Sequence, residues 1–366
     1  MKVIVGIFIF FIVVFIYLHV QFHLKTGEDL EIYELENTSK ERLEEICDLR
    51  QPVLFDFECS HVLQMFQLSH LLKNYHAFEI KIRNVKETEE IKESTELHLP
   101  LPLKSAKILF DEDKHSQYFT ERNNDFLNET GMIKTLQKYD AYLRPYMVSN
   151  CNYDILMGSN KTTTPFKYEI NYRNYFLCTK GSVKIKMTPP HSTKYLQTIY
   201  DYDNFEFHSK INPWNNESDF EKVKYLEVTL NEGNTLFIPA YWWYSIEFTT
   251  NQSCVVSYKY RTYMNNIAVL PYFGLYFLQN QNVKRRAYKT VDLNSTINSN
   301  LKETSELNES KTNESNEFKE TNQSPLLETS YVETNTINNV LTNTDTLDAN
   351  NNVFDGTSNK LLFSEI

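Results

Sequence analysis

The sequence predicts a mainly β fold, a double-stranded β-helix (jelly roll) with flanking α-helices, together with an N-terminal transmembrane helix and a disordered C-terminal tail. Three observations support this prediction. Short alternating apolar segments separated by turn residues fill residues 150–265, a pattern typical of antiparallel sandwiches and barrels. An almost unbroken apolar run occupies residues 3–22. After residue 290 the composition becomes polar and acidic.

The apolar run reads VIVGIFIFFIVVFIYLHVQF. As a helix it spans about 30 Å at about 1.5 Å per residue, which matches the hydrocarbon core of a bilayer. We therefore interpret residues 1–24 as a transmembrane anchor. A cleaved signal peptide remains an alternative, although the run is long for one and lacks a small-residue cleavage pattern. A buried core helix is the third interpretation, and it rarely carries β-branched and aromatic residues on every face.

The charges that flank the run give a weak indication of topology. Lys2 precedes it, whereas Lys25 and several acidic residues follow it, so the comparison mildly favours a body on the translocated (luminal or extracellular) side of a single-pass membrane protein. Asn-x-Ser/Thr sequons fit that side, although an Asn-rich chain also produces them by chance. Examples are found at Asn37, Asn128, Asn160 and Asn216.

Residues 25–149 are expected to form the helical and strand-containing N-terminal part of the domain. Thr38 with Glu41 has the spacing of a capping box and predicts a helix start, and this helix must end before Pro52. A short buried strand is predicted at 51–55 and another at 78–82. Apolar spacing predicts helices over 62–71 and 133–143, and the acidic segment 86–96 reads as a solvated loop.

Residues 150–265 are expected to form the jelly-roll core. In the strand predicted at 244–248, period-two alternation places Tyr244, Ile246 and Phe248 on one face and Ser245 and Glu247 on the other. Gly181-Ser182 reads as a hairpin turn. The strands are predicted at 154–157, 163–169, 175–180, 183–187, 225–230, 235–238, 244–248 and 253–260.

The chain after the strands divides in two. Residues 266–290 are predicted to contain a C-terminal helix. Residues 291–366 contain 35 Ser, Thr or Asn among 76 residues, with 13 acidic and 4 basic side chains, and we expect this segment to be disordered. The net charge is −11 and no basic surplus is present, so the charge gives no support for binding nucleic acid.

Five well-separated cysteines without a CxxC pair predict buried free thiols instead of a zinc site or a disulfide framework. The sequence also contains no GxSxG, Walker or HExxH motif.

One stretch is more specific. Residues 233–248, GNTLFIPAYWWYSIEF, combine a glycine turn, an apolar run with Ile-Pro and a tryptophan pair. This segment resembles the corresponding segment of the JmjC and cupin-like 2-oxoglutarate oxygenases, a superfamily that includes the asparaginyl hydroxylase that inhibits hypoxia-inducible factor. The resemblance extends over roughly residues 52–263. It implies a cupin-like jelly roll with Fe(II) and 2-oxoglutarate as cofactors.

The residues that hold iron in that family are not retained. The family frame is Thr-Pro-x-His-x-Asp, where this chain has TPFKYE at residues 164–169, and the family's Trp-Trp-His appears here as Trp-Trp-Tyr. Lys167 therefore stands at the first histidine, Glu169 at the aspartate and Tyr244 at the last histidine. An ammonium repels a dication, and one carboxylate with a phenol makes a poor iron site. We expect no metal; His191 and His208 are conceivable substitutes but fall on no matching strand.

The anchor for the oxoacid carboxylate also looks lost. The family places a basic residue where this chain has Val183, and alternation directs Lys184 to the opposite face. Thr164, which can bond the oxoacid in the family, is kept. We therefore expect no cofactor, and a pocket formed by Thr164, Val183, Trp242 and Trp243.

We hypothesise that Lys167 occupies the place of the metal, pairs with Glu169 and has Tyr244 opposite it. The alternative is that both charges lie at a wet rim. The sequence thus predicts a membrane-anchored cupin-like protein that acts as a binding or structural module without hydroxylase activity. An atypical Fe(II)/2-oxoglutarate-dependent protein hydroxylase is the alternative. The expected partners are the membrane, through residues 3–22, and either a protein partner or a second copy of the chain.

Overall fold

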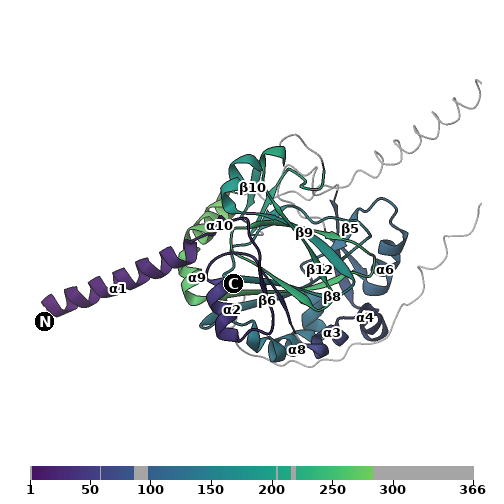
Figure 1. The fold of residues 1–366 in the computed structure, drawn as a ribbon, viewed down its shortest axis with the longest axis horizontal. Helices are drawn as coiled ribbons and strands as arrows, with labels where there is room; N and C mark the ends of the chain where they lie inside the picture. The colour runs from purple at the N-terminus through teal and green to yellow at the C-terminus, as the bar shows by residue number, and fades with distance from the viewer. Residues whose placement is uncertain (1, 58, 86–97, 203–204, 216–219, 283–366) are drawn as a thin grey trace, which may run out of the picture. The chain divides into compact units, whose positions relative to one another are not determined.

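The structure, a computed structural model, describes residues 2–57, 59–85, 98–202, 205–215 and 220–282. Two β-sheets form the body (Figure 1). Within the described residues, the order of strands in the larger sheet is β1 (Tyr33–Leu35), β2 (Val53–Asp56), β13 (Asn234–Ile238), β8 (Arg173–Lys180), β15 (Cys254–Thr262), β6 (Val148–Gly158), β5 (Tyr118–Thr120), β3 (Glu79–Asn84) and β4 (Leu99–Pro102). The order in the smaller sheet is β10 (Thr198–Asp201), β11 (Glu206–Ser209), β7 (Lys167–Tyr168), β14 (Trp243–Phe248), β9 (Ser182–Thr188) and β12 (Leu226–Asn231).

The larger sheet is buried on both faces. Successive residues of β8 belong to different clusters: Phe176 and Cys178 pack between the two sheets, whereas Tyr175 and Leu177 pack against the helices on the outer face. This follows from the alternation of side chains along a strand. The predicted alternation of β14 is confirmed, because Tyr244, Ile246 and Phe248 all lie in the cluster between the sheets.

Short helices cover the outer face of the larger sheet. They are α2 (Lys40–Cys47), α3 (Ser60–Met65), α4 (Leu68–Tyr75), α6 (Leu103–Glu112), α7 (Asn124–Glu129) and α8 (Met132–Tyr139), and α9 (Tyr263–Ala268) and α10 (Leu270–Asn282) follow the last strand. Three short 3₁₀ segments are also present, η1 (Asp140–Tyr142), η2 (Pro190–Tyr195) and η3 (Phe220–Lys222). The sheet-rich body with flanking helices agrees with the predicted fold class.

Several predicted elements differ in detail. The strand expected at 163–169 is reduced to β7 plus a single bridge between Thr163 and Glu247. Ser39, and not Thr38, caps α2, because the Ser39 side chain accepts a hydrogen bond from the backbone N–H of Arg42. The helix predicted over 62–71 is two helices, since the extended backbone of Gln67 interrupts it. The segment 86–96, residues 283–290 and the predicted disordered tail lie outside the described residues.

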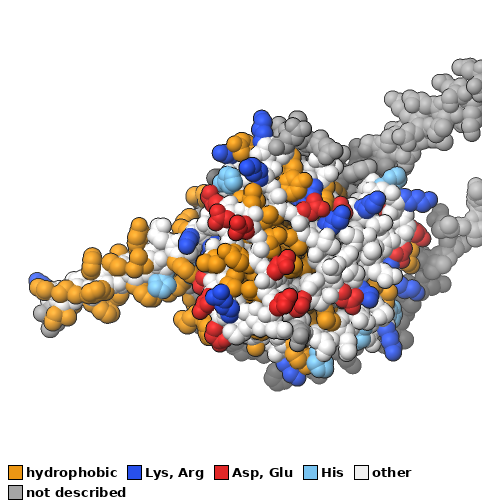
Figure 2. All heavy atoms as spheres, viewed as in Figure 1, with side chains coloured by type: hydrophobic (Ala, Val, Ile, Leu, Met, Phe, Trp, Pro, Cys, Tyr) orange, Lys and Arg blue, Asp and Glu red, His pale blue; other side chains and the backbone are white. Residues whose placement is uncertain are grey.

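The apolar N-terminal run forms one helix, α1 (Lys2–Leu24), whose side chains are exposed along nearly its whole length (Figure 2). The helix is long and apolar enough to cross a membrane, a property that membrane spans share with signal sequences. Its last turn contacts the body. The His23 ring stacks on Tyr172 with 4.8 Å between ring centroids, and its Nε2 lies 3.0 Å from the Thr262 hydroxyl.

The predicted free cysteines are confirmed: Cys47, Cys59, Cys178 and Cys254 are buried free thiols, and Cys151 is partly exposed.

Candidate functional site

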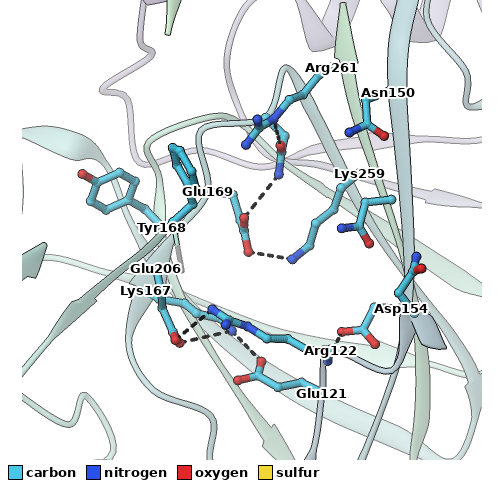
Figure 3. A pocket seen from close by; sticks show the side chains of 14 residues that line it. Glu121, Arg122, Asn150, Asp154, Lys167, Tyr168, Glu169, Glu206, Lys259 and Arg261 are labelled. Carbon is cyan, nitrogen blue, oxygen red and sulfur yellow. Dashed lines mark hydrogen bonds and ion pairs between the residues drawn. The ribbon is translucent and has the colours of Figure 1, made fainter. Parts of the chain in front are cut away.

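A polar cavity of about 350 Å³ opens beside β7 (Figure 3). Its wall carries four carboxylates, four basic side chains and several amides. The residues that line it come from β6, β7, β11, β15, the start of α7, the segments that follow β5 and β7, and the residue before β11. They are Glu121, Arg122, Asn124, Asn150, Asn152, Asp154, Lys167, Tyr168, Glu169, Asn171, Phe205, Glu206, Lys259 and Arg261. Both Lys167 and Glu169 are therefore brought to one cavity, as the sequence predicted.

Lys167 is a buried cation with carboxylate partners. It lies on β7, between β11 and β14, and is only 6% exposed. Its Nζ lies 2.5 Å from Glu121 Oε2 and 3.9 Å from Glu206 Oε1. Burial lowers the pKa of Lys167, and the charge of Glu121 opposes that effect. A charged group this deep in a protein is tolerated only with such partners.

Two arginines complete the ion pairs around Lys167. Arg83 on β3 contacts Glu121 and lies 3.1 Å from Glu206, and Arg122 Nη2 lies 2.9 Å from the other Glu206 oxygen. Burial raises the pKa of Glu121, but the charges of Lys167 and Arg83 outweigh it and hold that pKa well below its usual range. Glu121 is therefore an ionised carboxylate in the interior. We call Arg83, Glu121, Arg122, Lys167 and Glu206 the inner ion-pair network.

Glu169 has a separate set of donors. The Lys259 ammonium on β15 lies 2.7 Å from its Oε1, and the two side chains point toward each other (Figure 3). The Tyr244 hydroxyl donates to the same oxygen at 3.2 Å, and Asn171 Nδ2 donates to Oε2 at 3.2 Å. Burial raises the pKa of Glu169, yet Lys259 and Lys167 together lower it below its usual value. Burial, followed by the charge of Glu169, raises the pKa of Tyr244 well above its usual value, so the phenol remains a donor.

The predicted pairing of the three positions is partly corrected by this geometry. Tyr244 does approach Glu169, as expected. The ion-pair partner of Lys167, however, is Glu121, and that of Glu169 is Lys259. The reason is that β11, β15 and the segment after β5 supply further charges to the same cavity, which the spacing along one strand cannot reveal. The alternative of a wet rim does not describe Lys167, which is buried.

The tryptophan pair does not line this cavity. Both rings are fully buried and point into different clusters, Trp242 between the sheets and Trp243 near β7 and β11. Trp242 Nε1 donates to the Gly27 carbonyl at 3.1 Å, and Trp243 Nε1 donates to the Thr193 hydroxyl at 2.8 Å. The prediction that these rings form a pocket is therefore corrected: they are core residues with satisfied N–H groups.

Thr164 and Val183 also lie away from the cavity lining. Thr164 is buried, and its hydroxyl oxygen accepts a hydrogen bond from the backbone N–H of Ile246 at 2.9 Å. Val183 is fully buried between the sheets, as its predicted inward orientation requires. Thr164 thus holds the chain to β14, and Val183 is a packing residue.

Several residues of the cavity escaped the sequence analysis. Lys259 and Arg261 are two residues apart on β15, so strand alternation directs both side chains to one face. This spacing could have identified the pair from the sequence. Glu121, Arg122 and Glu206 carry no local signal, because their role depends on which strands become neighbours.

The donor set of this corner does not fit Fe(II). The first position carries a buried ammonium held against Glu121, and the carboxylate at the aspartate position, Glu169, already accepts from Lys259, Tyr244 and Asn171. Fe(II) sites of the two-histidine, one-carboxylate type need neutral imidazoles in place of a cation and a phenol. Across the described ranges, no three His, Cys, Asp or Glu side chains are grouped so that they could hold a metal ion.

The comparisons with known proteins add one positive result. The profile of a family described as cupin-like domain matches residues 38–266, which contain the smaller sheet, the larger sheet except for β1, and the whole cavity. A search of curated proteins finds no significant match.

Proposed function

Because the chain belongs to the cupin-like domain family, we propose that it is a membrane-anchored cupin-like protein that acts as a binding or structural module and has no Fe(II)/2-oxoglutarate-dependent hydroxylase activity. We interpret its two sheets as the double-stranded β-helix of that family. The family assignment agrees with the resemblance of residues 233–248, and the loss of activity rests on the chemistry of the cavity.

The observation that carries the proposal is the buried Lys167. Its ammonium stands where the family has a metal-binding histidine, and it is fixed there by a carboxylate 2.5 Å away. A dication placed at this corner meets a positive charge in a poorly solvated site, where like charges repel strongly. Freeing Lys167 means breaking an ion pair that two arginines also support.

The cavity itself supports a binding role. Four acidic and four basic side chains line it, so its charge is balanced, and most of these groups already have partners. Amides of Asn150 and Asn152 add both donors and acceptors to its lining. Such a surface suits a neutral or zwitterionic polar ligand, or polar side chains of a protein partner, better than a strongly charged anion.

The contacts at the end of α1 support an anchor that stays attached. Arg50 Nη2 donates to the Phe22 carbonyl at 3.3 Å, and the Arg50 guanidinium lies 5.0 Å from the Phe22 ring. Trp242 binds the carbonyl of Gly27, just beyond the helix. Cleavage at the end of the apolar run would remove some of these contacts. Their presence therefore favours an uncleaved anchor over a signal peptide.

The proposal is tested by reconstituting the missing ligands. We expect the full chain, purified in detergent, to release no succinate from 2-oxoglutarate in the presence of Fe(II). The triple variant Lys167→His, Glu169→Asp, Tyr244→His is expected to gain binding of Mn(II), because it restores two imidazoles and a carboxylate. Succinate release by the wild-type chain that is lost in Glu169→Ala would contradict the proposal and establish the atypical hydroxylase.

A further inference from the structure

Helix α10 is apolar on two opposite faces. Its inner face packs on the body through Phe273 and Tyr276, whose ring centroids lie 5.3 and 5.5 Å from that of Phe205. Tyr272 on the same side lies 5.4 Å from Phe207. The outer face is not covered by the described residues: Leu270 is 62% exposed, Leu275 42%, Phe277 58% and Leu278 56%.

The sequence of α10, LPYFGLYFLQNQN, contains no charged residue. Leu270, Phe277 and Leu278 stand at helical spacing of seven and eight residues, so they lie along one side of the helix. A surface helix of a soluble body normally carries charges on its outer side. An exposed apolar strip of this kind marks an interaction surface.

The structure places α10 beside the end of α1. Helix α1 packs against α9, and α10 follows α9 directly at Val269 (Figure 1). Leu24 of α1 and Tyr272 of α10 also line the same opening, a mainly apolar cavity of about 260 Å³. Helix α10 is therefore close to the point where the apolar helix leaves the body.

We propose that the outer face of α10 lies on the lipid surface of the membrane that α1 crosses. This inference rests on the proposed anchoring by α1. An anchored body holds α10 at a high effective concentration of lipid, so modest burial of Leu270, Phe277 and Leu278 suffices for contact. Tyr263 and Ile267 of α9, the helix that contacts α1, are also exposed. A second copy of the chain is the competing occupant, and the experiment below separates the two.

The test introduces the photoreactive residue benzoylphenylalanine at one position at a time in the full chain, reconstituted in nanodiscs that contain phosphatidylcholine and phosphatidylserine. Position 277 reports on α10, where benzoylphenylalanine replaces Phe277, a side chain of similar shape. Position 8 on α1, where Phe8 is exposed, reports on anchoring. Position 108 is the matched control, because Ile108 is an exposed apolar residue of α6, on the side of the body away from α1 in Figure 1.

We expect lipid adducts at positions 8 and 277 that exceed those at position 108 by at least about tenfold. Lipid adducts at position 8 but none above the control at 277 would overturn the proposal for α10 and leave the anchor intact. Adducts between two chains at position 277 would overturn it in favour of a dimer. Absence of lipid adducts at position 8 would overturn the anchor, and the proposal for α10 with it.

Discussion

Replacing Lys167 by methionine tests the inner ion-pair network most sharply. The substitution keeps an unbranched side chain and removes the ammonium that lies 2.5 Å from Glu121 and 3.9 Å from Glu206. Removing one partner of a buried ion pair destabilises a protein by about 3 to 5 kcal/mol, because an uncompensated charge is left behind. Arg83 still contacts Glu121, so we expect a loss near the lower end, about 3 kcal/mol in the free energy of unfolding.

The assay is urea unfolding of the full chain in mild detergent, followed by tryptophan fluorescence, since Trp242 and Trp243 are fully buried. Lys180→Met is the matched control. The Lys180–Glu232 pair has a similar chemistry, with 3.1 Å between Nζ and Oε2, but its side chains are 38% and 41% exposed. An exposed pair contributes less than about 1 kcal/mol, so the control is expected to change little.

A double-mutant cycle identifies the partner. The variant Glu121→Gln, combined with Lys167→Met, is expected to show a coupling energy of about 1 to 3 kcal/mol, as residues in direct contact do. The reasoning is refuted if Lys167→Met costs no more than Lys180→Met, or if the coupling with Glu121 is close to zero.

Three further predictions follow from the same contacts. The free energy of unfolding decreases as the pH falls below about 4.5, because the pKa values of Glu121 and Glu169 lie below their usual 4.5 in the folded chain and the unfolded chain therefore binds protons first. We expect Glu121→Gln to flatten this dependence between pH 7 and pH 3. An unchanged slope contradicts the assignment of the low pKa to Glu121. Tyr244→Phe removes a hydrogen-bond donor to Glu169 and is expected to lower the free energy of unfolding by about 0.5 to 1.5 kcal/mol. Tyr258→Phe is the control and is expected to be neutral or stabilising, because the buried Tyr258 hydroxyl has no hydrogen-bond partner among the described residues. Equal effects of the two substitutions in thermal unfolding argue against the Tyr244 contact. Gly27→Ala places a Cβ 2.2 Å from the Arg50 carbonyl oxygen and is expected to lower the free energy of unfolding by about 1 to 3 kcal/mol. Gly274→Ala is the control and is expected to have no such effect, because the space around Gly274 is open. If Gly27→Ala leaves the free energy of unfolding in urea unchanged, the segment after α1 is not packed as described.

Much of the fold could be predicted from local pattern. The strands around the Gly181-Ser182 turn and the strand that begins near Tyr244 have clear alternation, and their positions are confirmed. Short strands such as β5 and β11 were not predicted, because their three and four residues are too few to show an alternation of apolar and polar side chains. The strand expected at 163–169 was overestimated, because among the described residues of this segment outside β7 only Thr163 forms a bridge, to Glu247 of β14, and Pro165 has no N–H to donate to a ladder.

The site was predictable only as far as a single strand carries the information. Lys167, Glu169 and Tyr244 were identified from their positions in residues 164–169 and 233–248, and the structure brings them to one corner. Their partners could not be inferred, because Glu121 lies 46 residues from Lys167 and Lys259 lies 90 residues from Glu169. The electrostatics of a buried charge depend on such neighbours, which only the tertiary structure supplies.

The aromatic residues show the same limit from the other side. The tryptophan pair marked the family correctly but suggested a pocket that the structure places elsewhere. Trp242 directly precedes β14 and Trp243 begins it, and the two rings enter different clusters and do not line one pocket.

Metal content is the most direct test of the account. The full chain, incubated without oxygen with excess Fe(II) or Mn(II) and 2-oxoglutarate and then freed of unbound metal, is analysed by mass spectrometry for bound metal per chain. The account predicts far less than one ion per chain, because the buried Lys167 ammonium is held in this corner by Glu121. A stoichiometric ion that is lost in both Lys167→Ala and Glu169→Ala would contradict it.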